Sequence, residues 1–421
     1  MIRKICLLTA LLLFAIHNPS KGQVVPKTVD IPRYPCLHTD KGQDSLHFPK
    51  GRSAYKATFY TKLNTLLQTG QGRVNILHIG GSHVQAGFFS HRVRVDLDSI
   101  SSSVVGDRGL LFPFSALKTN APQSYSFTYK GSWSGKRCLV REPTLPLGVS
   151  GASVTTRDTL GCLTLALCDL SLWKPSVLRL LGEGEDERIE PVLVCGNDTI
   201  SASAPDGKPG YTFQLPLKTD TCRIAFRGIL QDSLGFTLRG VLPEGSDNGI
   251  TYTASGINGA AVPSWLRCSK FEEELSLLPP DLVVFGIGIN DANVLPHTFD
   301  VEQFKDNYRE LICRIRSVNP SCCFLFITNN DCWFNVKGRR RQFNTNTPKV
   351  QRAMKQLARE CGGAVFDVFA MMGGLRSSSA WVRAGLQRPD HIHFTREGYE
   401  LWGDLLYNAL INDYNNHFVK D

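Results

Sequence analysis

Features that mark zinc, membrane or nucleic-acid proteins are scarce in this chain of 421 residues. Its 13 cysteines include no Cys-x-x-Cys pair, which argues against a zinc site, and we expect neither a metal nor another cofactor. After residue 22 no apolar run approaches the roughly 18 residues of a membrane-spanning helix, so we expect no transmembrane segment. The net charge of +9 is mild for this length, and the one dense basic run is Lys337–Gln342. Such a run is typical of a solvated loop, although it would also suit an anionic polymer, and we expect no nucleic-acid partner.

The N-terminus has the order of parts of a secretory signal peptide. Two basic residues precede the apolar run Ile5 to Ile16, and a polar stretch follows it. We therefore predict that residues 1–22 are removed and that the mature chain is exported, to the periplasm, the cell surface or the medium. Removal of Cys6 would leave an even number of cysteines in a compartment that permits disulfides, whose pairing the sequence does not define. Residues 23–54 are predicted to form an N-terminal extension.

Three zones of different pattern follow this extension. Residues 55–105 read as helix, strand and helix, whereas residues 106–250 hold short β-type runs that alternate with Gly, Pro, Asp and Asn turns. From 251 to 421, continuous apolar runs such as Asp281–Gly288 are each followed by a helical pattern, which is typical of a parallel sheet covered on both faces. We predict an α/β fold: a three-layer α/β/α sandwich with a parallel sheet, interrupted by an inserted antiparallel β-sandwich.

The first apolar strand of this pattern ends in Gly80-Gly81-Ser82-His83. Glycines permit a tight turn from strand to helix, and Ser82 then lies at the N-terminus of the next helix. A serine there fills the ordinary role of a helix cap. The same position also suits a nucleophile, because the helix amides and dipole favour the negative charge of a reaction intermediate. Taken alone, these four residues leave both roles open.

Polar residues and glycines follow three later strands, and the carboxyl ends of parallel strands meet at one edge of a sheet. Gly259 and Asn290 each fit either an ordinary turn or a contact to a ligand. Asp390 and His393 are three residues apart before the last helix. The carboxylate can therefore hold one ring nitrogen while the other takes a proton from a serine. A rival reading makes His391 and His393 metal ligands, but a single His-x-His is a weak metal motif.

In this order the four motifs resemble the SGNH hydrolases, the GDSL-like lipase/acylhydrolase superfamily. The first block of that family corresponds to residues 80–83, and its second-block pattern Gly-x-Ser-Gly corresponds to Gly256–Gly259. The third block, Gly-x-Asn-Asp, corresponds to Gly288–Asp291. The fifth block, Asp-x-x-His, corresponds to Asp390–His393.

The resemblance implies a role for each of five residues. Ser82 is the nucleophile, His393 the general base, and Asp390 the group that orients His393. The backbone amides of Ser82 and Gly259 and the side chain of Asn290 form the oxyanion hole. The implied chemistry is ester hydrolysis through an acyl-enzyme intermediate, without a metal or another cofactor.

One position departs from the family pattern. The family has an aspartate immediately before the serine, where this chain has Gly81. That aspartate is not one of the catalytic groups, so the resemblance still implies an active enzyme. A non-catalytic, glycan-binding relative of the same fold is the alternative.

Export and the inserted β-rich region make the chain most similar to secreted O-acetylesterases of polysaccharides and peptidoglycan. We therefore predict a secreted serine esterase that removes O-acetyl or similar small acyl groups from a glycan. A lipid or other acyl-ester hydrolase of the same fold is a further alternative, although the chain lacks the long apolar helix of a lipase lid. The aromatic residues of the insertion fit sugar stacking or core packing; they are Tyr125, Tyr129, Trp133, Trp173 and Tyr211.

Overall fold

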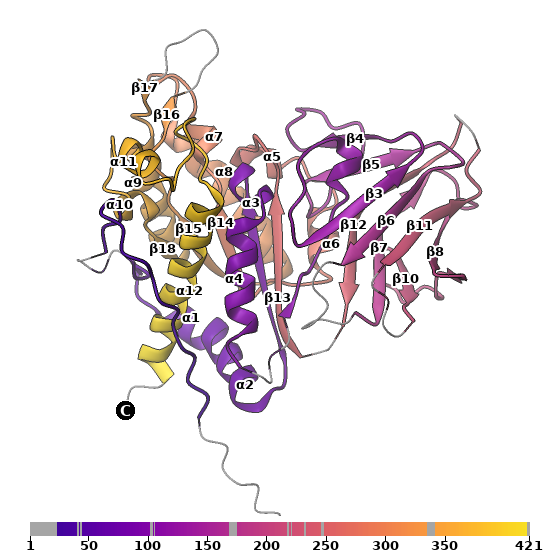
Figure 1. Ribbon diagram of the computed structural model, residues 1–421, viewed down its shortest axis with the longest axis horizontal. Coiled ribbons are helices and arrows are strands. Elements are labelled where there is room, and N and C mark those ends of the chain that lie inside the picture. The colour runs from indigo at the N-terminus through magenta and orange to yellow at the C-terminus, as the bar shows by residue number, and fades with distance from the viewer. Residues whose placement is uncertain are drawn as a thin grey trace, which may run out of the picture.

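The computed structural model describes residues 23–418 apart from 40, 41, 43, 102, 103, 105, 168–174, 217, 218, 220, 231, 232, 246, 247 and 335–341. The predicted signal peptide, most of the basic run Lys337–Gln342, and Trp173 therefore lie outside the described residues. Figure 1 shows an α/β part, which contains both ends of the described chain, beside a part built of β-strands. Within the described residues, every helix is too short or too polar to cross a lipid bilayer.

Six parallel strands form the central sheet of the α/β part. Their order across the sheet is β18 (Ala364–Phe366), β15 (Cys323–Ile327), β14 (Leu282–Gly286), β1 (Arg73–Gly80), β13 (Gly249–Gly256) and β2 (Gly106–Asp107). On β1, Ile76 lies opposite Leu282 of β14 and Tyr252 of β13. β14, β15 and β18 are apolar throughout because both faces of the sheet are buried. Parallel pairing places the carboxyl ends of β1, β13 and β14 at the same edge.

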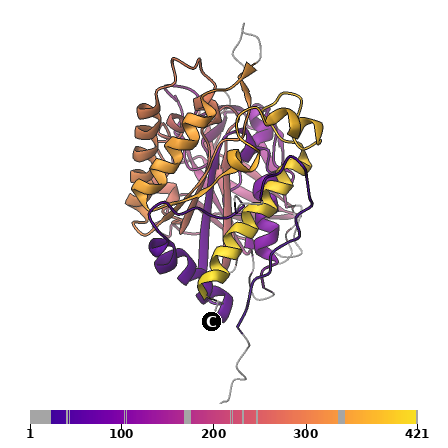
Figure 2. The ribbon, with the colours of Figure 1, turned by 90° about the vertical axis from the view of Figure 1, so that its left-hand side faces the viewer.

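Helices cover both faces of this sheet (Figure 2). One face packs on α8 (Val301–Val318) and α9 (Thr347–Cys361), and the other packs on α2 (Thr61–Thr69), α4 (Phe88–Asp98) and α12 (Arg396–Phe418). Side chains alternate along β14 between these two layers. Val283 and Phe285 join the core on the α8 side. Leu282 and Val284 join the core on the α12 side. The predicted three-layer α/β/α sandwich is therefore confirmed.

Shorter elements complete the α/β part. They are α1 (Ser53–Tyr55) with the following π-helical turn Lys56–Tyr60, α3 (Ser82–Gln85), α5 (Val262–Trp265), α6 (Phe271–Leu275), α7 (Ile289–Ala292), α10 (Val368–Met371), α11 (Ser378–Arg383), and the antiparallel pair β16 (Trp333–Phe334) and β17 (Gln342–Phe343). Of these, α3, α5, α7 and α10 follow the carboxyl ends of central strands. Short turns and helices therefore follow β1, β13, β14 and β18 at that edge of the sheet.

The chain between β2 and β13 forms two five-stranded antiparallel sheets. One has the order β10 (Tyr211–Gln214), β7 (Val177–Gly184), β12 (Phe236–Glu244), β5 (Ala152–Thr156) and β4 (Ser134–Arg137), and the other has the order β3 (Tyr125–Lys130), β6 (Cys162–Leu167), β11 (Thr221–Arg227), β8 (Glu190–Cys195) and β9 (Asp198–Ser201). A 3-10 turn, Phe114–Leu117, precedes β3. The predicted antiparallel insertion is confirmed. Its predicted boundaries, 106 and 250, fall within β2 and β13 of the central sheet.

The inserted sandwich shares its hydrophobic core with the α8 side of the central sheet. One cluster of buried residues contains Leu238 of β12 together with Phe285 of β14. A buried ion pair crosses the same boundary, because Arg239 Nε donates to Glu274 Oε1 over 2.6 Å and the two side chains are 3% and 0% exposed. Glu274 Oε2 also accepts the Val149 N–H at 2.9 Å. Burial raises the pKa of Glu274, and the Arg239 charge opposes that rise.

Arg239→Met should lower the free energy of unfolding by about 3–5 kcal/mol, because it leaves the Glu274 carboxyl buried without its cation. Guanidinium-induced unfolding measures the change. Arg188→Met is the control, since Arg188 pairs with Asp186 at the surface, where solvent screens the interaction and little stability depends on it. Similar losses in the two variants would show that the buried pair does not hold the two parts together.

Candidate active site

Ser82 lies at the carboxyl edge of the central sheet, where β1 turns into α3. The turn is tight, because a Cβ on Gly80 would come within 2.9 Å of the Gly286 carbonyl oxygen. Gly81 occupies the cap position and Ser82 is the first residue of the helix, with no side-chain cap bond at this end. The Ser82 hydroxyl instead forms a hydrogen bond of 2.8 Å with Nε2 of His393. Of the two roles that the sequence left open, the helix cap is therefore not the one observed.

His393 and Asp390 lie in the loop that precedes α12. His393 Nδ1 is 2.9 Å from Asp390 Oδ2, and Asp390 Oδ1 accepts the backbone N–H groups of Ile392 and His393 at 2.8 and 2.9 Å. Partial burial acts to raise the pKa of Asp390, but these hydrogen bonds outweigh it and the pKa lies below the ordinary value of an aspartate. An ionised Asp390 holds the ring proton on Nδ1, which leaves the lone pair of Nε2 facing Ser82.

The loop after β13 and the start of α7 meet beside the Ser82 turn. Asn290 Nδ2 donates to the Ala260 carbonyl oxygen at 2.9 Å, which fixes the orientation of the Asn290 amide. Gly259 has φ +83°, a left-handed conformation that glycine adopts without strain. The Ile257 N–H donates to the Gly80 carbonyl oxygen at 3.2 Å, so this loop is tied directly to the end of β1. The structure thus brings Gly259 and Asn290 to the same edge as Ser82.

Gly81, where the resembled family has an aspartate, packs beside Asn290. A Cβ at this position would lie 3.2 Å from Asn290 Nδ2 and 3.4 Å from the Ala260 carbonyl oxygen. The backbone φ of −96° lies outside the left-handed region that favours glycine, so it is the neighbouring atoms that crowd this position. The hydrogen bonds of Ser82 and Asn290 form without a carboxylate at position 81.

His83 is a neighbour of the triad that the sequence did not single out. Its Nδ1 is 2.7 Å from the Tyr399 hydroxyl, and its ring centroid is 5.5 Å from that of His393. Burial, followed by the nearby His393, lowers the pKa of His83 to about 3, so His83 is neutral at physiological pH. The only sequence signal was its position next to Ser82, because Tyr399 is distant in the chain.

His391, the rival metal ligand, has its own set of partners. Its Nδ1 is 2.8 Å from the Ser378 hydroxyl, and its ring stacks on Trp333 at a centroid distance of 3.8 Å. His393 instead contacts Ser82 and Asp390. Across the part of the chain that the structure describes, no group of three His, Cys, Asp or Glu side chains is arranged to hold a metal ion.

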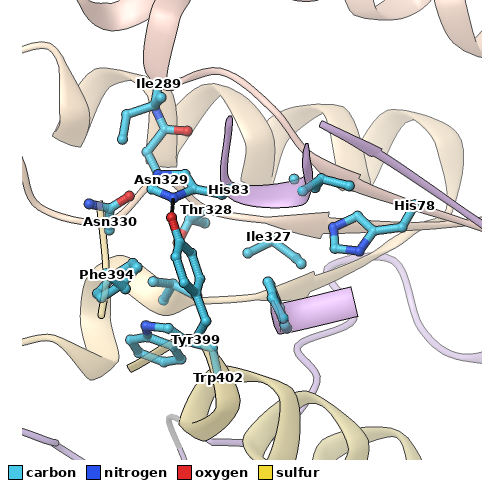
Figure 3. Close-up of a pocket in the computed structure, with 14 residues that line it drawn as sticks. His78, His83, Ile289, Ile327, Thr328, Asn329, Asn330, Phe394, Tyr399 and Trp402 are labelled. Atoms are coloured by element: carbon cyan, nitrogen blue, oxygen red, sulfur yellow. Dashed lines mark hydrogen bonds between the residues drawn. The ribbon is translucent and has the colours of Figure 1, made fainter. Parts of the chain in front are cut away.

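A cavity of about 40 Å³ borders His83 on the inner side of this edge (Figure 3). It lies between the central sheet and α12, and its walls include Ile327, Phe394 and Tyr399. Within the described residues, three buried nitrogen atoms of its lining have no hydrogen-bond partner: His78 Nε2, Asn329 Nδ2 and Trp402 Nε1. A space of this size, with unpaired nitrogen atoms in a largely apolar wall, accommodates a small number of water molecules.

The chain resembles known proteins in sequence, over part of its length, and in fold. Residues 219–401 match the model of the GDSL-like Lipase/Acylhydrolase family. This span contains Gly259, Asn290, Asp390 and His393, and it begins after Ser82. No curated protein sequence matches the chain at a significant level.

Among solved structures, one described as a peptidoglycan O-acetylesterase matches with a TM-score of 0.69 and 20% sequence identity, over 88% of this chain and 99% of that one. An acetylxylan esterase from Geobacillus stearothermophilus matches with a TM-score of 0.28 and 20% identity, over 40% of this chain and 74% of that one. A lipase/acylhydrolase from Enterococcus faecalis matches with a TM-score of 0.30 and 21% identity, over 39% of this chain and 78% of that one.

The first of these structures shares its fold with almost the whole of the present chain. The fold and the family match agree with the motifs read from the sequence. Over residues 219–401 the chain is therefore similar to the GDSL-like Lipase/Acylhydrolase family, and its fold is that of the first structure.

Proposed function

We propose that the protein is a serine esterase in which Ser82 is the nucleophile, His393 the general base and Asp390 the group that orients His393. The observation that carries this proposal is the continuous hydrogen-bonded path from Ser82 Oγ to His393 Nε2, at 2.8 Å, and from His393 Nδ1 to Asp390 Oδ2, at 2.9 Å. A serine hydroxyl is a weak nucleophile at its free pKa, and an adjacent base that is itself oriented by a third group activates it.

The reaction runs in two stages. His393 Nε2 takes the Ser82 proton as Oγ attacks the ester carbonyl, and it then returns that proton to the departing alkoxide, which leaves as an alcohol. Water attacks the resulting acyl-serine with His393 again as the base, and the collapse of the intermediate releases the acid and the free Ser82 hydroxyl. Asp390 stabilises the imidazolium that forms in each stage and remains ionised.

In this proposal, three donors stabilise the negative oxygen of each tetrahedral intermediate. They are the Ser82 and Gly259 backbone amides and the Asn290 side chain. One hydrogen of the Asn290 amide is bound to the Ala260 carbonyl oxygen, and the second is available to an oxyanion. Donors that are fixed in advance need no reorganisation during the reaction, which is the main source of their effect.

The proposed substrate is an O-acetyl or similar small acyl ester on a glycan, with peptidoglycan as the leading candidate. The likeness of nearly the whole chain to a structure described as a peptidoglycan O-acetylesterase supports this choice. The exposure of the triad supports it too, since the side chains of His393 and Asp390 are 33% and 34% exposed. An ester on a large polymer can reach such a site without entering a tunnel. A substrate of this kind would place the enzyme outside the cytoplasm, in line with the predicted signal peptide.

The aromatic residues of the insertion divide between the core and the surface. Tyr125 is buried and its hydroxyl donates to the Phe112 carbonyl oxygen, so it serves packing. Trp133 and Tyr211 are half-buried against the same core. Tyr129, at 38% exposed, remains a candidate for stacking on a sugar.

Ser82→Ala should reduce hydrolysis of p-nitrophenyl acetate by about 10³-fold or more, because it removes the attacking oxygen. Ser317→Ala is the matched control, since the Ser317 hydroxyl only bonds a carbonyl oxygen within α8, and its rate should equal that of the wild type. Steady-state kinetics on the three proteins checks this. Equal rates for Ser82→Ala and wild type would rule out the serine-esterase mechanism and favour a glycan-binding protein.

Asp390→Asn should lower kcat by about 10²–10⁴-fold and leave KM nearly unchanged, because a neutral amide no longer holds the proton on His393 Nδ1. The fluorescence and unfolding midpoint of the variant, compared with those of the wild type, show whether the fold is preserved. A folded Asp390→Asn protein with wild-type kcat would remove Asp390 from the mechanism.

Acetate release from O-acetylated peptidoglycan should have a higher kcat/KM than release from acetylated xylan. Enzymatic determination of free acetate measures both rates, with chemically de-O-acetylated peptidoglycan as the blank. Hydrolysis of p-nitrophenyl acetate without acetate release from any glycan would contradict the substrate assignment while leaving the esterase chemistry intact.

A further inference from the structure

Gln85, the last residue of α3, makes contacts that the mechanism above does not use. Its side chain is almost fully buried, at 1% exposed. Its Oε1 accepts the backbone N–H of Asn258 at 2.6 Å, and its Nε2 donates to the Asn120 carbonyl oxygen at 2.8 Å and to Thr119 Oγ1 at 3.2 Å. One side chain therefore joins three segments: α3, the loop after β13, and the chain that leads into the inserted sandwich.

The glycine at the end of β13 makes this arrangement possible. A Cβ on Gly256 would come 2.3 Å from the Gln85 backbone nitrogen and 2.7 Å from the Val84 carbonyl carbon. No other residue would allow α3 to lie so close to β13. Gly256 thus serves a contact between two backbones of the protein.

The insertion holds the same loop through a second contact. Asn258 Nδ2 donates to Asn120 Oδ1 at 2.5 Å and to Thr119 Oγ1 at 3.3 Å. On the far side of the loop, Leu139 of the insertion lies 3.7 Å from the place where a Gly259 Cβ would be. Asn258, immediately before Gly259, is therefore held at both its backbone N–H and its side chain.

These contacts bear directly on the direction of the Gly259 amide. The peptide unit that carries the Gly259 N–H begins at the carbonyl carbon of Asn258. Gly259 has a left-handed φ and no side chain, so nothing in the residue itself limits its rotation. The loop is fixed before it by the Ile257 N–H on Gly80, and after it by Asn290 on the Ala260 carbonyl oxygen. A turn bond from the Ala260 N–H to the Ile257 carbonyl oxygen, at 2.9 Å, spans Asn258 and Gly259, and the contacts from Gln85, Thr119 and Asn120 act at Asn258 itself.

We propose that Gln85 and Asn120 are positioning residues that aim the Gly259 amide at the oxyanion. This inference rests on the proposed function, because it assigns a task within that oxyanion hole. It also gives the inserted sandwich a part in transition-state stabilisation, since Asn120 belongs to the segment that enters it. Neither residue touches the reacting atoms, and each acts through the loop that carries Gly259.

The test compares two glutamines that hold a backbone in the same way. Gln85→Met keeps the side-chain volume and removes every hydrogen bond of the Gln85 amide. Gln68→Met is the matched control, because Gln68 bonds the N–H and the carbonyl oxygen of Val24, at 2.9 and 3.0 Å, far from the site. With p-nitrophenyl acetate, Gln85→Met should lower kcat by about 10–100-fold with KM within about twofold, since a misdirected donor loses part of its effect on the transition state. Gln68→Met should leave both constants unchanged.

Asn120→Ala provides a second variant at an exposed residue, where folding is not at risk. Its kcat should fall by about 3–10-fold. In the double variant Gln85→Met/Asn120→Ala, the fold-reduction in kcat should not exceed the product of the two single fold-reductions, because the two side chains hold one loop. Wild-type kcat in Asn120→Ala would overturn the part assigned to the insertion.

Hydrogen exchange of the peptide spanning residues 256–261 gives a readout that does not depend on activity. Exchange should be faster in Gln85→Met than in the wild type, and unchanged in Gln68→Met. Wild-type kcat, or a change confined to KM, in Gln85→Met would overturn the inference and leave the esterase assignment standing. Absence of Ser82-dependent hydrolysis in the wild type would overturn the proposed function, and with it the catalytic task given to Gln85. The exchange data would then report only whether Gln85 holds the loop.

Discussion

The hydrogen bond between Ser82 and His393 joins residues that are 311 positions apart, and the rest of the site is arranged around it. Parallel pairing of β1 with β13 and β14 brings the ends of these strands to one edge. The packing of α12 on α4 then carries the His393 loop to the same edge from the other end of the chain. Either strand slippage or loss of this helix contact would separate the two residues.

Close backbone contacts set the shape of this edge. Gly80 lets β1 pass the Gly286 carbonyl oxygen, and Gly256 lets β13 pass the backbone of α3. The resulting turns are short, so the geometry of the backbone, and not the length of the side chains, places the polar groups at this edge. The insertion strengthens the arrangement, because it shares a core with the α/β part and is bonded to it through the buried Arg239 and Glu274 pair. The inserted β-sandwich therefore packs as part of the same core as the α/β part.

Much of this organisation can be predicted from local pattern. Continuous apolar strands indicate a parallel sheet, and alternation of short runs with turns indicates an antiparallel insertion. The three-residue spacing of Asp390 and His393 predicts that their side chains contact each other within a single loop. The contacts of Gln85 with Asn258 and Asn120 could not be predicted, because they depend on how three distant segments pack. The same holds for His83 on Tyr399, and for β2, which pairs with β13 through only two residues. Taken alone, the first motif leaves the helix-cap role of Ser82 open, and the contact with His393 distinguishes the two roles.

The central claim is that Ser82 is a nucleophile made reactive by His393, and covalent labelling tests it most directly. A fluorophosphonate reacts with an activated serine and forms a stable adduct in the oxyanion hole. Peptide mass spectrometry of the wild-type protein and of His393→Ala after equal exposure locates and measures that adduct. The account predicts one adduct, on the peptide that contains Ser82, in the wild type and almost none in His393→Ala. Labelling at another serine, or equal labelling of Ser82 in both proteins, would contradict it.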